Sequence, residues 1–189
     1  MRERVKEIIL ESIRVKEGLL KGDVSLILEV SGLIIESFKK GGKLIIFGNG
    51  GSASDAQHIA AELVGRFKKD RPALPAISLT ANTSIITALA NDFGYDIVFA
   101  RQIEALAEKF DVALGISTSG KAKNVALGLK QAKKMGIKTI ALTGGDGGEA
   151  ARLADISLIV SSCVTARIQE AHILIGHIIC ELIEEALPA

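Results

Sequence analysis

Residues 43–55 read KLIIFGNGGSASD, a short apolar run that leads directly into a turn containing three glycines. A continuous apolar run of this length is typical of a strand that is covered on both faces of a parallel sheet. Glycine lacks a Cβ atom, so the turn lets the backbone approach a ligand closely. Apolar residues at helical spacing follow at about 53–67. The stretch therefore predicts a strand, a glycine turn and a helix in succession.

The same alternation continues to the end of the chain. Further apolar runs occupy 73–79, 112–116, 139–143 and 156–160, and helical patterns occupy 83–90, 96–107, 122–135, 147–153 and 166–187. Strands that alternate with helices predict a parallel sheet joined by right-handed crossovers. We therefore expect an α/β fold, with three α/β/α layers around a five-stranded parallel sheet.

Two further helical patterns, at 2–20 and 23–40, precede the first strand. Asp23 is a suitable N-cap for the second of them, and Gly41-Gly42 ends it. Neither pattern contains residues that suggest chemistry. We expect residues 1–41 to form a helical pair that packs on the core and on other subunits, and residues 1–189 as a whole to form one domain.

The composition of the 189 residues excludes several classes of protein. Hydrophobic residues make up 48% of the chain, which is too apolar for a disordered protein. The net charge of +1 and the 4% of aromatic residues give no reason to expect nucleic acid or an anionic membrane surface as a partner. Cys163 and Cys180 make no disulfide framework, and no signal peptide or membrane span is recognisable. We therefore expect a cytoplasmic protein.

The segments after the strands matter most, because ligands bind at the carboxyl ends of the strands in open α/β sheets. After the run at 112–116 the chain reads STSG, which places Ser117, Thr118 and Ser119 at the start of a helix. Hydroxyls and backbone N–H groups in that position can hold an anion, although an ordinary capped turn has the same sequence. The hydroxyls suit a sugar phosphate, and the glycine motifs of nucleotide sites are missing from the sequence.

Other turns give weaker signals. In GNGGS, Asn49 and Ser52 are candidates to hydrogen-bond sugar hydroxyls, whereas GGDGG at 144–148 is interpreted as a turn that leaves the fourth strand. Asn91 and Asp92 close the helix after the second strand, either as a simple turn or with Asp92 bound to a polyol hydroxyl.

Ionisable side chains share faces of two predicted helices. His58 and Glu62 are four residues apart, about one turn on the same face, and Arg66 follows four residues later to pair with Glu62 or reach a ligand. Gln169 and His177 are eight apart, a rotation of about 80° that lets both face one cavity, while His172 points about 140° away from His177. A histidine beside a carboxylate is an acid–base pair, a weak metal pattern or a plain surface pair.

Five motifs occur in a familiar order: GNGGSASDAQHIAAELVGRF, the NDFG segment, GISTSG, ALTGGDGG and ARIQEAHILIGH. With them the chain resembles the SIS (sugar isomerase) domain family, specifically the phosphoheptose isomerases, over essentially its whole length. The resemblance implies a flavodoxin-like fold, a homotetramer and active sites at subunit interfaces. It further implies conversion of sedoheptulose 7-phosphate to D-glycero-D-manno-heptose 7-phosphate, the first step toward nucleotide-activated heptose.

The resemblance also assigns roles to residues. Glu62 matches the general base of the family and His177 its general acid, the two groups that an enediol mechanism needs. The residues implied to bind zinc, which some members contain, are His58, Glu62, Gln169 and His177. Those implied to bind substrate are Asn49, Gly50, Gly51, Ser52, Glu62, Arg66, Asn91, Asp92, Ser117, Thr118, Ser119 and Gln169, with the phosphate on the STSG hydroxyls.

Two positions depart from the family pattern. Ala122 stands where a serine often contacts phosphate, and Ala166 where heptose isomerases often have aspartate. One lost hydroxyl costs about 1 kcal/mol, which binding can tolerate, but the identity of the sugar is left open. The alternatives are an isomerase or sensor for another phosphosugar, or a non-enzymatic relative that binds the bacterial replication initiator. Such binders lack the acid and the histidine found here as Glu62 and His177, which favours an enzyme.

Overall fold

The computed structural model describes residues 1–22 and 24–187, so the predicted N-cap Asp23 lies outside the described residues. Five strands form one sheet: β1 (Leu44–Gly48), β2 (Ala76–Ser78), β3 (Val112–Ser117), β4 (Lys138–Gly144) and β5 (Ile156–Val160). Their order is β2-β1-β3-β4-β5, and every neighbouring pair is parallel. The predicted five-stranded parallel sheet is therefore confirmed.

The edge strand β2 is shorter than its sequence pattern predicted. We expected a strand over 73–79, whereas the ladder with β1 covers only Ala76–Ser78. Pro72 and Pro75 have no N–H group to donate to a ladder. Pro75 contributes only its carbonyl oxygen, which accepts the Leu44 N–H at 2.9 Å.

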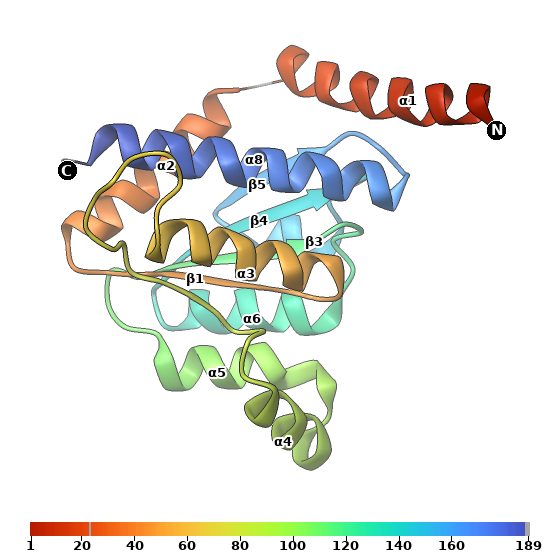
Figure 1. Ribbon diagram of the computed structural model, residues 1–189. Coiled ribbons are helices and arrows are strands. Elements are labelled where there is room, and N and C mark those ends of the chain that lie inside the picture. The colour runs from red at the N-terminus through yellow and green to blue at the C-terminus, as the bar shows by residue number, and fades with distance from the viewer. Residues whose placement is uncertain (23, 188–189) are drawn as a thin grey trace.

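Helices cover both faces of the sheet and complete three layers (Figure 1). One face is covered by α2 (Ser25–Lys39), α3 (Gly51–Val64) and α8 (Thr165–Ala186), and the other by α5 (Val98–Leu106), α6 (Lys123–Lys134) and α7 (Gly148–Leu153). Between β2 and α5 lie α4 (Thr83–Phe93) and the short 3-10 helix η1 (Tyr95–Ile97). The single helix predicted over 96–107 is thus divided between η1 and α5.

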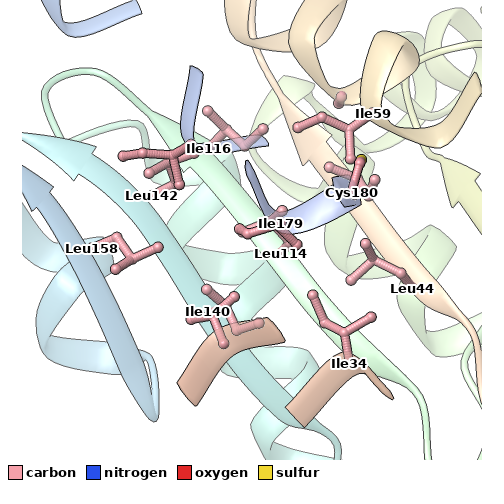
Figure 2. Packing of buried hydrophobic residues seen from close by; sticks show 14 of the residues in the cluster. Ile34, Leu44, Ile59, Leu114, Ile116, Ile140, Leu142, Leu158, Ile179 and Cys180 are labelled. Carbon is pink, nitrogen blue, oxygen red and sulfur yellow. The ribbon is translucent and has the colours of Figure 1, made fainter. Parts of the chain in front are cut away.

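Alternate side chains of a strand point to opposite faces, which gives the sheet two cores. Leu44 and Ile46 of β1 pack with α2, α3 and α8, whereas Ile45 and Phe47 pack with α5 and α6. Figure 2 shows the first of these cores, in which isoleucine side chains from α2, α3 and α8 meet leucine and isoleucine side chains of the strands. The strands are apolar on both faces because both faces are covered.

Glycines at two contact points let α3 and α8 lie close together. A Cβ atom at Gly176 of α8 would lie 2.7 Å from Ile59 Cδ1, and one at Gly51 of α3 would lie 1.8 Å from Gln169 Nε2. These contacts join the first turns of the two helices and then their middles, so the helices run side by side in the same direction (Figure 1). This close approach brings polar residues of the two helices within reach of one another.

The leading helix α1 (Arg2–Lys21) contacts α8 but has no buried residue. Val5, Ile9, Leu10 and Ile13 on this helix are all exposed. An apolar cavity of about 390 Å³ lies between α1, α2 and α8. Exposed apolar faces of this extent mark surfaces for association. Neither α1 nor any other helix in residues 1–22 and 24–187 combines the length and the apolar composition that a bilayer crossing requires.

Candidate active site

The turns after β1 and β3 meet in a small pocket at the carboxyl ends of the strands. The lining residues, which surround about 200 Å³, are Asn49, Ser52, Ile116, Ser117, Thr118, Ser119 and Ala122. The GNGGS and STSG turns singled out in the sequence therefore lie together. None of the lining side chains is charged, so an anion in the pocket would be held by hydroxyls and by N–H groups at the start of α6.

The GGDGG turn at 144–148 packs against the end of the STSG loop. A Cβ atom at Gly120 would lie 1.9 Å from the carbonyl oxygen of Gly147, and the Gly120 carbonyl accepts the Ala150 N–H at 2.9 Å. Gly120 also has a φ of +63°, which favours glycine. The sequence predicts that this turn only leaves β4. In the structure it also holds the pocket loop against α7.

Replacing Gly120 by alanine should lower the free energy of unfolding by about 2–3 kcal/mol, because the new Cβ atom meets backbone and the positive φ is strained. Gly136 is a matched control, since its φ is +75° and a Cβ atom there would meet nothing within 4 Å. Urea unfolding of both alanine variants separates the clash from the strain. Equal losses of stability in the two variants would show that the contact with Gly147 is unimportant.

Three ionisable side chains converge where α3 meets α8. His58 Nε2 lies 3.0 Å from His177 Nε2 and 3.1 Å from Glu62 Oε1, and donor atoms of the three residues all lie within 4.8 Å of one another. The shared face predicted for His58 and Glu62 is confirmed. The Phe67 ring packs 5.3 Å from the His177 ring. Such a cluster can transfer protons or hold a metal ion.

Comparisons with known proteins identify the family. The SIS domain model matches residues 8–144. The phosphoheptose isomerase of Aquifex aeolicus is 55% identical over 185 residues, which cover 98% of this chain and 97% of that protein. The chain belongs to the phosphoheptose isomerase family of SIS-domain proteins.

Two further relatives of this phosphoheptose isomerase family member support the assignment. The phosphoheptose isomerase of Sulfurimonas denitrificans is 50% identical over 189 residues, 99% of this chain and 97% of that protein. The solved structure of phosphoheptose isomerase GmhA from Neisseria gonorrhoeae is 42% identical, covers 98% of this chain and 99% of that chain, and has a TM-score of 0.93. The three-layer fold class predicted from the sequence is confirmed by this match.

Gln169 of this phosphoheptose isomerase family member contacts α3 two turns before His58. Its amide packs against Gly51 in the first turn of α3. Gly51 precedes His58 by seven residues, which is about 10 Å along the helix axis. Gln169 and His177 are eight residues apart on α8, which is about 12 Å along its axis.

The residue directly after the NDFG segment contacts Asn49 of the pocket, although the sequence did not single it out. Asn91 and Asp92 are exposed at the end of α4, where Asn91 Nδ2 donates to Asp92 Oδ1 at 2.9 Å. Tyr95, directly after this segment, donates its hydroxyl to Asn49 Oδ1 at 3.2 Å. A tyrosine one residue beyond a turn glycine was the only signal available.

A buried ion pair beside the cluster was also missed. Arg71 Nε donates to Glu184 Oε1 at 3.0 Å, and the two side chains are 3% and 2% exposed. Arg71 also donates to the main-chain oxygens of Glu62 and Leu63, each at 2.8 Å. Arg66 is exposed beyond the end of α3, so the arginine bound to this helix end is Arg71. Glu184 falls on the apolar stripe of α8, which was the available signal.

Two buried groups near the site have shifted pKa values. Burial lowers the pKa of His172 to about 4, and a hydrogen bond between its Nε2 and the Thr143 carbonyl only partly opposes this. His172 thus lies outside the cluster, as its predicted orientation indicated. Burial raises the pKa of Asp55 to about 6, against the effect of His58, which lowers it.

The low pKa of His172 predicts acid destabilisation. Between pH of about 6.5 and 4 the unfolded chain binds more protons at this residue than the folded protein, so stability should fall as the pH is lowered through that range, by up to about 3 kcal/mol. Asp55, with a raised pKa, has the opposite effect and gains stability on acidification. Urea unfolding of Asp55→Asn and of Asp55→Asn/His172→Asn at several pH values isolates the histidine. Equal pH dependence in the two variants would contradict the prediction.

Proposed function

We propose that this protein is an aldose–ketose isomerase that converts sedoheptulose 7-phosphate to D-glycero-D-manno-heptose 7-phosphate. The proposal rests on the cluster of Glu62, His58 and His177, whose donor atoms lie close together. It is supported by the 55% identity of the chain to a phosphoheptose isomerase. A carboxylate and an imidazole with different pKa values can move a proton between adjacent carbons near neutral pH.

In the proposed mechanism, Glu62 is the base and His177 is the acid. Glu62 removes a proton from C1 of the ketose while His177 donates one to the C2 carbonyl oxygen, and the enediol forms. Glu62 then returns its proton to C2 while His177 takes one from the C1 hydroxyl, which leaves the aldose. His58 contacts both partners, at 3.1 and 3.0 Å, and orients them.

The substrate would extend from the STSG pocket of one subunit to the Glu62 cluster of a neighbouring subunit. Its phosphate would bind Ser117, Thr118 and Ser119. The GNGGS turn, with Asn49, Gly50, Gly51 and Ser52, would meet the sugar, and Asn49 lies close enough to the three hydroxyls to reach the phosphate as well. Ser52 and Glu62 lie ten residues apart on α3, about 15 Å along the axis. That distance is longer than one sugar phosphate, which supports an active site assembled between subunits.

We therefore propose a homotetramer, with residues 1–41 of a single 189-residue domain joining the subunits. The exposed apolar face of α1 supports such an assembly. The exposed residues Arg66, Asn91 and Asp92 would then reach substrate where subunits meet. The cytoplasm, where phosphorylated sugars are metabolised, is the compartment that we propose.

We also propose that the cluster binds one zinc ion per subunit. Two histidines and a carboxylate are donors that zinc favours, and their donor atoms already lie within 4.8 Å of one another. His58, Glu62 and His177 would hold the ion, and Gln169 would join them by leaving Gly51 or from a second copy of the chain. Bound zinc would polarise the substrate carbonyl. Because it would compete for the Glu62 carboxylate, its need in catalysis requires a separate test.

Protein dialysed against zinc and then against buffer should retain about one zinc per chain, and His58→Ala should retain much less, because it removes one histidine donor from a site of three or four protein donors. Elemental analysis measures the content, and Asp92→Ala, outside the cluster, is the control. Equal zinc contents in the wild type and in His58→Ala would contradict the proposed zinc site. A metal-free protein with full activity would show that zinc has no catalytic role.

Purified protein of defined metal content tests the isomerase itself. Incubation with sedoheptulose 7-phosphate should give the aldose product in the NMR spectrum, whereas other ketose phosphates should react more slowly. A faster reaction with another ketose phosphate would change the assigned substrate. Intact phosphate binding without conversion of any member of the panel would favour a sensor or a non-enzymatic relative.

A further inference from the structure

We propose that Asn124 and Tyr95 are positioning residues that fix the Asn49 side chain so that it offers an N–H donor to the STSG pocket. The inference rests on the proposed function only in taking Asn49 as a ligand of the phosphorylated substrate. Neither Asn124 nor Tyr95 needs to touch that substrate.

Three segments that are distant in the sequence meet at Asn49. Asn49 Nδ2 donates to Asn124 Oδ1 at 2.8 Å, and Asn124 Nδ2 donates back to Asn49 Oδ1 at 2.9 Å. The Tyr95 hydroxyl donates to the same Oδ1 at 3.2 Å. Asn124 lies in the first turn of α6 and is only 4% exposed. The Asn49 amide is therefore held from two sides, by α6 and by η1.

A reciprocal amide pair does not by itself fix which end of each amide is nitrogen, because turning both amides over restores the same pairing. The backbone removes this ambiguity. The Val125 N–H donates to Asn124 Oδ1 at 2.9 Å, and a nitrogen in that place would set two donors against each other. The backbone of α6 therefore orients Asn124, and Asn124 in turn orients Asn49.

Counting the hydrogen bonds of Asn49 leaves one group unused. Its Oδ1 accepts from Asn124 and Tyr95, which occupies both lone pairs, and its Nδ2 gives one of two N–H groups to Asn124. In the described part of the chain, the second N–H has no acceptor, and the side chain lines the pocket beside Ser52 and Ser117. A fixed donor selects a hydrogen-bond acceptor, such as a phosphate oxygen, and disfavours a ligand amine or amide N–H.

This arrangement matters because an unrestrained asparagine amide turns over and presents oxygen as readily as nitrogen. An oxygen toward the pocket would repel a phosphate. If the amide is already fixed before the ligand binds, binding does not have to supply the free energy needed to hold the amide in one orientation. The pocket therefore binds phosphate more tightly although its contacts to the phosphate are unchanged.

A double-mutant cycle with inorganic phosphate tests the inference without needing turnover. Isothermal titration is applied to wild type, Asn49→Ala, Asn124→Ala and the double variant. Each single substitution should weaken binding about tenfold, the worth of one aligned hydrogen bond to a charged group, and the double variant should be no weaker than Asn49→Ala. Losses that multiply to about a hundredfold would show that Asn124 acts independently of Asn49 and would overturn the inference.

Tyr95→Phe keeps the experiment decisive if Asn124→Ala does not fold, because this side chain is 52% exposed and loses only a hydroxyl. It should weaken phosphate binding a few-fold in wild type and not at all in the Asn49→Ala background. Asn82→Ala, which removes a capping side chain from α4 outside the pocket, is the control for general destabilisation. Wild-type protein that binds no phosphate, or a Tyr95→Phe loss that persists without Asn49, would overturn the inference.

Failure of the proposed function would look different. A protein that converts no ketose phosphate but shows the non-additive phosphate cycle would keep the role of Asn124 and lose the isomerase. In an active enzyme, Asn124→Ala should raise KM for sedoheptulose 7-phosphate about tenfold with little change in kcat, because the pocket lies away from the reacting carbons. A loss confined to kcat would contradict the positioning role.

Discussion

Replacing Glu62 by glutamine should lower kcat for sedoheptulose 7-phosphate by about 10²- to 10⁴-fold, the usual contribution of a general base. Glutamine keeps the size of the side chain and can still hydrogen-bond His58, but it cannot take up a proton from carbon. The Kd for the substrate should therefore change little. Product formation followed by NMR and substrate binding followed by calorimetry measure the two quantities separately.

Glu181→Gln is the matched control for this prediction. Glu181 is a nearby carboxylate on α8 that pairs with Lys68 outside the cluster, so its loss should leave kcat within a few-fold of wild type. Zinc content is measured in both variants, because loss of a bound ion would otherwise imitate loss of the base. Full activity of Glu62→Gln would remove Glu62 from this role.

Replacing Glu184 by leucine should destabilise the protein by about 3–5 kcal/mol, because it leaves the buried Arg71 charge without its partner. The Glu184 carboxylate also accepts the N–H groups of Phe67, Lys68 and Lys69, at 2.7, 2.8 and 3.1 Å. Burial tends to raise the pKa of Glu184, but these N–H groups and Arg71 outweigh it and hold the pKa below its ordinary value. Tm at fixed protein concentration should fall by about 10 °C.

The exposed pair Lys68–Glu181 provides the comparison on the same two segments. Lys68→Ala should cost less than about 1 kcal/mol, since exposed ion pairs contribute little. The double variant Arg71→Leu/Glu184→Leu should lose less stability than Glu184→Leu alone, because the Arg71 charge is then removed together with its partner. A Glu184→Leu protein as stable as Lys68→Ala would show that the buried pair does not hold the 65–71 segment in place.

The sheet and its layers were predictable because the signals are local. Each strand is a continuous apolar run, and alternation with helices restricts the topology to a parallel sheet. The boundaries were less accurate where backbone chemistry intervenes. Prolines shortened β2, and η1 interrupted the helix expected over 96–107. Hydrophobicity patterns do not show either effect, because they describe side chains and not donor groups.

Residue spacing alone predicted the site only where its members share one element or one sheet edge, and the grouping of His177 with His58 and Glu62 came from the family resemblance. His58 and Glu62 are neighbours on a helix, and the STSG and GNGGS turns follow strands that pair with each other. The pairs Arg71–Glu184 and Asn49–Asn124 join residues 113 and 75 positions apart. Such contacts depend on how whole helices pack, so a single sequence holds no periodicity from which to derive them.

Helix α1 differs from the rest of the chain in how much apolar surface it buries, and therefore in what stabilises it. The sheet and its covering helices bury a large set of apolar side chains within one chain. Helix α1 has no fully buried residue and packs only Val15 and Leu19, partly buried, against the core, so it has less stabilisation of its own, because isolated helices are marginal in water. In the homotetramer proposed above, dilution should therefore fray α1 of a dissociated subunit before it affects the sheet, and hydrogen exchange at α1 would measure that dissociation.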